Sequence, residues 1–140
     1  MGQEKLILVG MAWYISSDKT KEIVRDFPSV EVQKEIKKVK ISGHSRMTDP
    51  GEFYLKLSER LEKLFYSFDK ILNVDIQFEY INTGSSKWLY YLISRLRDLC
   101  ITEGSIEINW YFESDDETIL ETGEVLQSLV TIPFNLISFD

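Results

Sequence analysis

The residues best placed to do chemistry lie in one short, hydroxyl-rich stretch near the middle of the chain. Thr83, Ser85 and Ser86 fall within four positions, around Gly84. The stretch follows an alternating strand pattern and precedes a helical one, so it is expected to form a strand-to-helix turn. Such a turn directs free backbone N–H groups and the positive end of the helix dipole outward. That arrangement suits a phosphate, either bound as a ligand or attached to a side chain.

Three interpretations of this turn are open from the residues alone. One Ser or Thr could serve only as the N-cap of the helix. A bound nucleotide is disfavoured, because the stretch has a single glycine and Lys87 alone does not make a P-loop. Covalent phosphorylation requires only an exposed hydroxyl that a kinase can reach.

Two further groups of residues could carry chemistry. Asp115, Asp116 and Glu117 are consecutive acids that could bind a divalent metal, but acids also stabilise the first turn of a helix. His44 is the single histidine and is expected in a surface loop, without the spacing of a catalytic or metal site. Together these residues define an alternative function, a small cytoplasmic enzyme. We nevertheless predict no catalytic residues, no cofactor and no metal site.

Trp88, Tyr91 and Arg95 share a face of the helix expected after the turn, offset from its leucines. They form either a second packing surface or a partner-binding patch. Both interpretations stay open, because aromatic side chains fill cores and, with arginine, are also enriched in binding hot spots.

Composition limits the classes of protein to consider. The 140 residues, 44% of them hydrophobic, predict one domain over residues 1–140 with a real core. The net charge of −7 argues against nucleic acid and, more weakly, against an anionic membrane as partner. Cys100 is the only cysteine, and it is expected in the core. With no visible signal peptide or membrane span, a cytoplasmic location is expected.

Hydrophobic spacing predicts the elements that position these residues. A first helix is expected to start at Asp49-Pro50, with Asp49 as its cap, and to carry Phe68 on its apolar face. A second is expected after the hydroxyl-rich turn and should end at about Gly104. A third is expected to start at residues 114–117 and to carry Leu129 on its apolar side. Strands are expected at residues 6–14, 30–33, 36–42 (ended by Gly43), 74–80, 106–112 and 131–137, the last at an edge. Residues 16–28 are expected to form a loop. This order predicts an α/β fold with a mainly parallel sheet.

Several motifs occur in an order that resembles a known family. They are Ile41-Ser42-Gly43-His44-Ser45, Phe53-Tyr54, Tyr80-Ile81-Asn82-Thr83-Gly84-Ser85-Ser86-Lys87, Trp110-Tyr111-Phe112-Glu113-Ser114-Asp115-Asp116-Glu117, Glu121 with Gly123-Glu124, and Ile132-Pro133-Phe134. Over about residues 30–137 they resemble the SiaC family of bacterial regulatory phosphoproteins. The first 29 residues match this family less clearly.

The resemblance implies a STAS-like fold, as in anti-sigma-factor antagonists, with a mixed sheet and helices mostly on one side. It also implies a non-catalytic switch. A dedicated protein kinase would phosphorylate Thr83 and a PP2C-type phosphatase would reverse this. The unmodified form would bind and activate a diguanylate cyclase, which makes cyclic di-GMP and promotes biofilm or aggregation.

The family usually has serine where this chain has Gly84. This glycine is expected to loosen the turn. Its presence leaves Ser85 and Ser86 as the alternative phosphate acceptors. The partner-binding surface is expected to comprise Asn82, Thr83, Gly84, Ser85, Ser86, Lys87, Trp88 and Tyr91. A constitutive interaction module with no switch is a further alternative.

Overall fold

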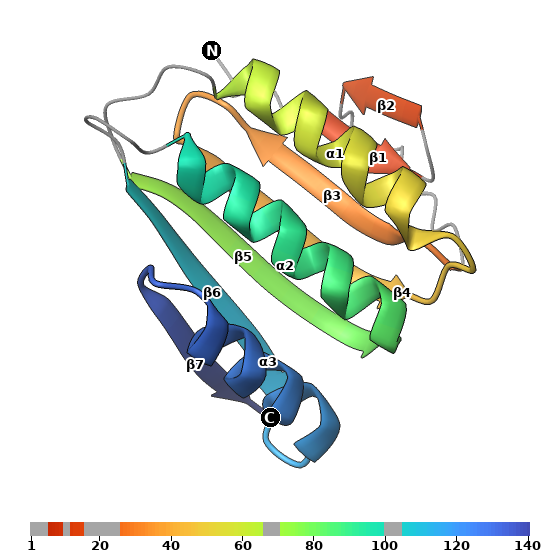
Figure 1. Cartoon of the computed structure of the whole chain (residues 1–140), viewed down its shortest axis with the longest axis vertical. Coiled ribbons are helices and arrows are strands. Elements are labelled where there is room, and N and C mark those ends of the chain that lie inside the picture. The colour runs from red at the N-terminus through yellow and green to blue at the C-terminus, as the bar shows by residue number, and fades with distance from the viewer. Residues whose placement is uncertain (1–5, 10–11, 16–25, 66–70, 100–104) are drawn as a thin grey trace.

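In the computed structural model, the described residues are 6–9, 12–15, 26–65, 71–99 and 105–140. They form seven strands and three helices in the order β1 (Leu6–Val9), β2 (Ala12–Ile15), β3 (Pro28–Gln33), β4 (Lys38–Ser45), α1 (Pro50–Leu64), β5 (Ile71–Ile81), α2 (Thr83–Asp98), β6 (Ser105–Glu113), α3 (Glu117–Leu129) and β7 (Phe134–Phe139). All seven strands belong to one sheet, in the order β2-β1-β3-β4-β5-β6-β7 (Figure 1).

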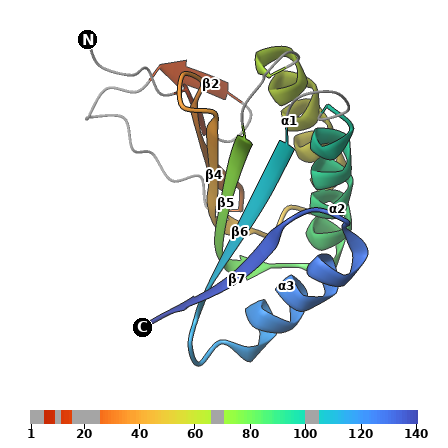
Figure 2. The same cartoon turned by 90° about the vertical axis from the view of Figure 1, so that its left-hand side faces the viewer.

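The sheet is mixed. Strands β2, β1, β3 and β4 pair antiparallel, whereas β4, β5, β6 and β7 pair parallel. Each parallel connection passes through a helix, and all three helices lie on the same face of the sheet (Figure 2). The predicted α/β fold, with a mixed sheet covered on one face, is therefore confirmed. Parallel strands end at a common edge, so the starts of α2 and α3 are brought to the same side of the sheet.

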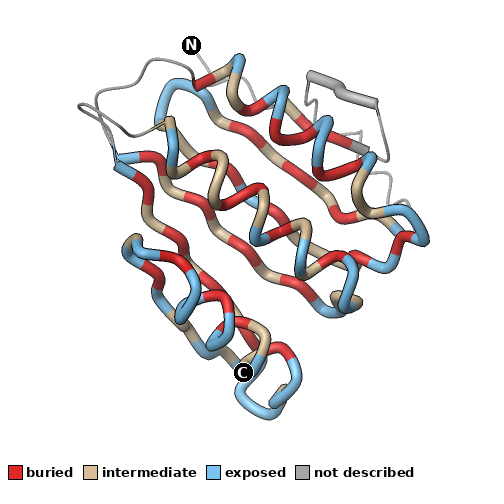
Figure 3. The backbone as a smooth tube through the Cα atoms, viewed as in Figure 1, coloured by how far each residue is buried: buried red, intermediate tan, exposed pale blue. Residues whose placement is uncertain are grey.

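The helix-covered face of the sheet is built from the residues whose alternation predicted the strands. In β5, Val74, Ile76 and Phe78 are buried while the residues between them are partly exposed, and β6 repeats this pattern (Figure 3). On α1, Leu57, Leu61 and other residues at helical spacing complete the core. The apolar residues that recur every second position in the strands and about every 3.6 positions in the helices therefore pack together in one layer.

Trp110 of β6 belongs to this layer and connects α3 to the sheet. Its side chain is fully buried, and its Nε1 donates to the carbonyl oxygen of Ile119 at 3.0 Å. A Cβ placed on Gly123 of α3 would lie 2.5 Å from the Trp110 ring, so only glycine allows this close approach.

The N-terminal part of the sheet differs from the prediction. Residues 6–14 were expected as one strand but form two, β1 and β2, paired from Leu6↔Ile15 to Val9↔Ala12. In the sequence, Gly10 lies between these two strands, and glycine commonly interrupts an extended pattern. Most of the loop expected at residues 16–28 lies outside the described residues, as do Phe68, Cys100 and Gly104, but Pro28 already belongs to β3.

The second strand of the predicted hairpin continues past its expected end. Gly43 does not end β4, because the strand runs on to Ser45 with a register shift between Gly43 and His44. Gly43 has a φ of +94°, a conformation that favours glycine and is typical of a bulge. His44 therefore lies in a strand, not in a loop. Ile36, expected in this strand, lies before it and is 44% exposed.

Candidate functional site

The turn between β5 and α2 is capped by Asn82, so the interpretation in which Thr or Ser caps this helix is wrong. The side-chain Oδ1 of Asn82 accepts a hydrogen bond from the backbone N–H of Ser85 at 2.8 Å. Its Nδ2 donates to the carbonyl oxygen of Met47 at 3.2 Å. Asn82 thus caps α2 and also ties it to the segment that precedes α1, which leaves the neighbouring hydroxyl groups free of this task.

The three hydroxyl residues of the turn have very different environments. Ser85 is fully buried, and its Oγ has no hydrogen-bond partner among the described residues. Ser86 is partly buried, and its Oγ donates to the carbonyl oxygen of Thr83 at 2.8 Å. Thr83 is exposed at the first position of α2, and its hydroxyl has no hydrogen bond to another described residue. Burial therefore removes Ser85 from the candidate acceptors and from the candidate contact residues, and Thr83 is the most accessible hydroxyl.

Hydrogen bonds of Ser45 connect the turn to strand β4 and to helix α1. The backbone N–H of Asn82 donates to the carbonyl oxygen of Ser45 at 2.9 Å, and Ser45 Oγ lies 2.7 Å from the Tyr54 hydroxyl. Burial raises the pKa of Tyr54, and its hydrogen bond with Ser45 only partly offsets this rise. Strand β4, helix α1 and the turn are thereby joined around one neutral phenol.

Gly84 is not required by the backbone of the turn. Its φ is not positive, and a Cβ added to it would lie 3.4 Å from Pro50 Cγ, an ordinary contact. The serine usual in the family would therefore fit here. At the start of α1, Pro50 occupies the expected first position, but the predicted cap is wrong, because the Asp49 side chain makes no capping hydrogen bond.

The face of α2 that carries Trp88, Tyr91 and Arg95 packs largely against α1. A Cβ on Gly51 of α1 would lie 2.8 Å from the Trp88 ring, which therefore rests directly on that glycine. Arg95 forms an ion pair with Glu62 of α1 and donates to the Tyr91 hydroxyl at 2.7 Å. The Glu62 hydrogen bond is also the main cause that raises the pKa of Arg95. These contacts favour the packing interpretation, and a role of Trp88 and Tyr91 in partner binding stays a prediction.

The electrostatic environment at the N-terminus of α2 favours an anion. Its first turn contains no acidic residue, so no carboxylate occupies the positive end of its dipole. Lys87 lies four residues after Thr83 on the same helix, is exposed, and forms no salt bridge with another described residue. A phosphate on Thr83 would therefore be stabilised by the dipole and placed beside a cation.

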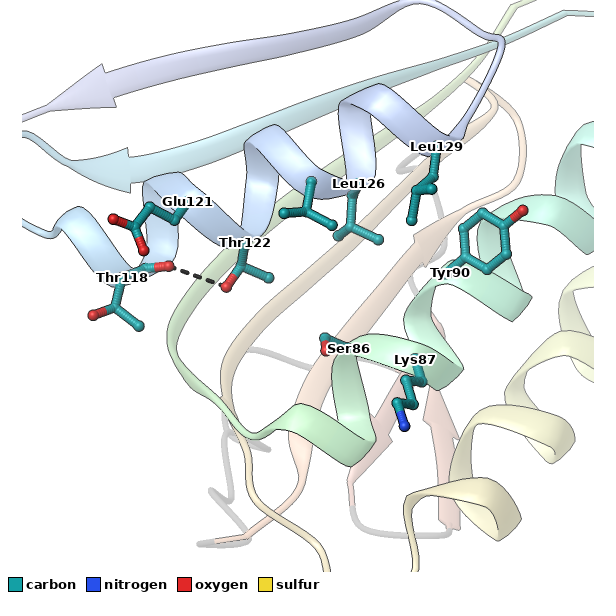
Figure 4. A pocket seen from close by; sticks show the side chains of 9 residues that line it. Ser86, Lys87, Tyr90, Thr118, Glu121, Thr122, Leu126 and Leu129 are labelled. Carbon is teal, nitrogen blue, oxygen red and sulfur yellow. Dashed lines mark hydrogen bonds between the residues drawn. The ribbon is translucent and has the colours of Figure 1, made fainter.

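A groove not expected from the sequence begins one turn further along α2. It has a volume of about 420 Å³ and is lined by Ser86, Lys87, Tyr90, Thr118, Glu121, Thr122, Val125, Leu126 and Leu129 (Figure 4). We call it the α2–α3 groove. Leu129 was expected on the buried side of α3 but is 52% exposed here. Val125, Leu126 and Leu129 form an apolar arc on α3 that is wider than the stripe a helix needs to pack on a sheet. The width of this arc, visible in the sequence, could have indicated the groove.

The residues of the alternative enzyme have separate partners. His44 Nε2 lies 3.2 Å from Glu79 Oε2 on β5, while Asp116 caps α3 by accepting from the N–H of Ile119 at 3.0 Å. Asp115 and Glu117 are exposed. Among residues 6–9, 12–15, 26–65, 71–99 and 105–140, no three His, Cys, Asp or Glu side chains gather as a metal site would require. Nothing in this geometry supports a catalytic centre.

Comparisons with a family model and with solved structures each find matches to the chain. The family described as SiaC family regulatory phosphoprotein matches residues 17–139. The structure resembles SiaC of Pseudomonas aeruginosa, with a TM-score of 0.73 and 16% identity over 89% of this chain and 100% of that chain. It also resembles a chain in the crystal structure of the diguanylate cyclase SiaD in complex with its activator SiaC, from the same organism. There the TM-score is 0.73 and the identity 16%, over 83% of this chain and 95% of that chain. At such identity the likeness shows a shared fold.

No curated protein matches the chain in sequence. No described helix is both long and apolar enough to cross a membrane.

Proposed function

Because this chain belongs to the SiaC family of regulatory phosphoproteins, we propose that it is a switch in which phosphorylation of Thr83 controls binding to a partner protein. The family is regulatory and not catalytic, in agreement with the prediction that the chain is not an enzyme. The observation that carries the proposal is the exposed hydroxyl of Thr83, which the Asn82 cap leaves free for modification.

The physical effect of the modification falls on the surface. A phosphoryl group adds about −1.5 to −2 charges and three strong acceptor oxygens. At the first position of α2 this charge is compatible with the fold, because the dipole favours an anion there and no acid competes with it. The phosphoryl group instead weakens binding of a partner that contacts the turn, through charge repulsion, steric bulk and altered hydration. The contact surface comprises Asn82, Thr83, Gly84, Ser86 and Lys87, with the exposed parts of Trp88 and Tyr91.

The partner we propose is a diguanylate cyclase that the unmodified form binds and activates, thereby controlling cyclic di-GMP and biofilm or aggregation. Support comes from the shared fold with a chain in the SiaD–SiaC complex. A protein kinase and a PP2C-type phosphatase set the state of Thr83. We place these reactions in the cytoplasm, where a lone cysteine stays reduced.

Phosphate-affinity electrophoresis and mass spectrometry of the protein from its native cells test the modification. We expect a slow-migrating form with phosphate on Thr83, absent in Thr83→Ala and retained in Thr118→Ala, a matched exposed threonine in the first turn of α3. Phosphate absent from Thr83 in every growth state would refute the proposal.

A pull-down from the same cells tests the consequence. Thr83→Ala should capture a diguanylate cyclase, and the Thr83-phosphorylated protein should capture it at least about tenfold less well, a difference of about 1.4 kcal/mol. Equal capture before and after phosphatase treatment would instead support the constitutive interaction module.

A further inference from the structure

Strand β7 forms one edge of the sheet, and part of its backbone is not paired with another described strand. Only β6 is its neighbour in the strand order (Figure 1). At the two ends of this pairing, the carbonyl oxygens of Pro133 and Phe139 accept hydrogen bonds from the β6 side at 2.9 and 2.8 Å. Alternate residues of a strand direct their backbone groups to opposite sides. The backbone groups of Leu136 and Ser138 therefore point away from β6.

This edge lacks the features that usually protect an edge strand. The six residues of Phe134–Phe139 include no charged residue and no proline, and their register with β6 runs without a shift. One protection is present at the start, where Gln127 Nε2 of α3 donates to the carbonyl oxygen of Phe134 at 2.9 Å. The unprotected part is therefore Leu136–Ser138. Such an edge is a template for pairing with another strand, and natural sheets usually block it with a charge, a proline or a bulge.

The charge around the edge is entirely negative. Residues 105–140, which contain β6, α3 and β7, include eight Asp and Glu residues and no Lys, Arg or His. The whole chain has a net charge of −7, so the rest of the chain is close to neutral. The negative charge is therefore concentrated at this end of the sheet.

Two of these acids lie close to β7. Glu107 Oε1 accepts a hydrogen bond from Asn135 Nδ2 of β7 at 3.2 Å. Glu124 precedes Gln127 by three residues on α3, so the two are neighbours on the helix surface, and Gln127 itself contacts the edge. A ligand that carries cations would complement both carboxylates.

A second copy of this chain does not suit the edge. Two β7 strands paired about a twofold axis would bring two α3 helices to the same side of the joined sheet. Each α3 carries Glu117, Glu121 and Glu124 and no cation. Repulsion between these two acidic helices disfavours the dimer.

We propose that the free edge of β7 at Leu136–Ser138 binds a cationic, extended segment of another protein, which adds a strand to the sheet. Backbone hydrogen bonds to this edge supply affinity, and the side chains of the segment supply specificity. Its apolar side chains pack beside Ile137 and Phe139, which are only partly buried, and its cations approach Glu107 and Glu124.

This surface is separate from the turn of the proposed switch. β6 lies between β7 and β5, and β5 is the strand that leads to Thr83. The inference therefore goes beyond the proposed function and does not depend on it.

Calorimetric titration at low salt, with a synthetic peptide in which lysine and valine alternate, tests the edge. We expect binding, with amide hydrogen exchange at Leu136 and Ser138 slowed at least about tenfold in the complex. The same peptide with N-methylated backbone amides keeps its charges but cannot pair as a strand, so it should bind at least about tenfold more weakly. A peptide with glutamate in place of lysine should not bind.

Variants of the edge test the same contact from the side of the protein. Ser138→Pro should weaken binding of the lysine–valine peptide at least about tenfold, because it removes an outward N–H and places a ring at the edge. This N–H does not bond β6, so the fold should be kept, and urea denaturation checks that it is. The matched control Ser138→Val keeps the N–H and should bind as the unaltered protein does.

A second pair of variants tests the placement of the charge. Glu124→Gln should weaken binding about threefold. Glu121→Gln removes an exposed carboxylate from the same helix, but Glu121 lines the α2–α3 groove, so this control should weaken binding less.

The proposal is overturned by any of three results. They are equal binding of the N-methylated and unmodified peptides, unchanged binding by a folded Ser138→Pro variant, and a stable dimer of the chain that Ser138→Pro dissociates in light scattering. The last result would identify a second copy as the occupant. The peptide comparison requires no variant, so it decides the matter even if Ser138→Pro does not fold. None of these measurements involves Thr83, so their failure would leave the proposed function intact.

Discussion

The turns that begin α2 and α3 follow neighbouring parallel strands, and an Asn or Asp side chain caps each of them. Asn82 accepts from the N–H of Ser85 at 2.8 Å, and Asp116 accepts from the N–H of Ile119 at 3.0 Å. The difference is charge. The α3 turn contains an acidic cap and Glu117, whereas the α2 turn has a neutral cap and no acid in its first turn. Capping geometry is therefore alike at the two turns, and what distinguishes the α2 turn is an unoccupied positive helix end beside the exposed hydroxyl of Thr83.

The two helices also differ in how closely a glycine in each of them packs against neighbouring side chains. Gly123→Ala on α3 should lower the free energy of unfolding by about 2–3 kcal/mol, because its Cβ would meet the buried Trp110 ring at 2.5 Å. Gly84→Ala on α2 should be neutral or stabilise by up to about 1 kcal/mol, since its Cβ meets only Pro50. Urea denaturation measures both. Similar losses for the two variants would remove this part of the comparison.

Tyr54 should make the free energy of unfolding decrease in alkali. Because burial raises the pKa of Tyr54, its contribution to stability is complete below pH 10 and is lost as the pH rises above 10. We expect this loss to approach about 1.4 kcal/mol per pH unit. Urea denaturation between pH 8 and 11 measures it. Tyr54→Phe should be less stable near neutral pH, where Ser45 loses its partner, but should lose less stability with alkali; an unchanged slope would exclude Tyr54 as the cause.

Removal of the two caps compares the turns directly. Asn82→Ala and Asp116→Ala should each lower the free energy of unfolding by about 1 kcal/mol. Asn82→Ala should cost somewhat more, because Asn82 also donates to the carbonyl oxygen of Met47. Chemical denaturation at neutral pH gives both values. A larger loss in Asp116→Ala would indicate that the link to Met47 contributes little.

A single added carboxylate should give the smallest effect and isolate the difference in charge. Thr83→Glu should stabilise the protein by about 0.3–1 kcal/mol at low salt, because its carboxylate enters an unoccupied helix N-terminus. Thr118→Glu should be close to neutral, because Asp116 and Glu117 already occupy the corresponding position. Thermal denaturation at low salt and at 1 M salt should show the difference and its loss by screening. Equal shifts at both positions would contradict the electrostatic distinction.

Much of the fold could be predicted because its signals are local. Alternation in β5 and β6, and Pro50 at the start of α1, placed these elements close to where they lie. Errors arose where one residue altered a pattern. Gly43 indicated the end of a strand but forms a bulge within it, because glycine favours both.

The candidate site was predicted less completely. The sequence placed three hydroxyls and an asparagine in one turn, but it could not assign their roles. Asn82 caps α2 partly because Met47, 35 residues away, accepts its amide group. Trp88 packs on Gly51, which no local spacing predicts.

The sequence by itself determined the periodicities, the chemistry available at residues 82–87 and the absence of acids from the first turn of α2, because these depend only on neighbours along the chain. The tertiary structure alone decided that Ser85 is buried, that Thr83 is exposed, and that α2 and α3 leave a groove beside Lys87. Exposure and contact depend on which distant segments meet. A local pattern contains no information about that meeting, since burial is set by the packing of all layers together.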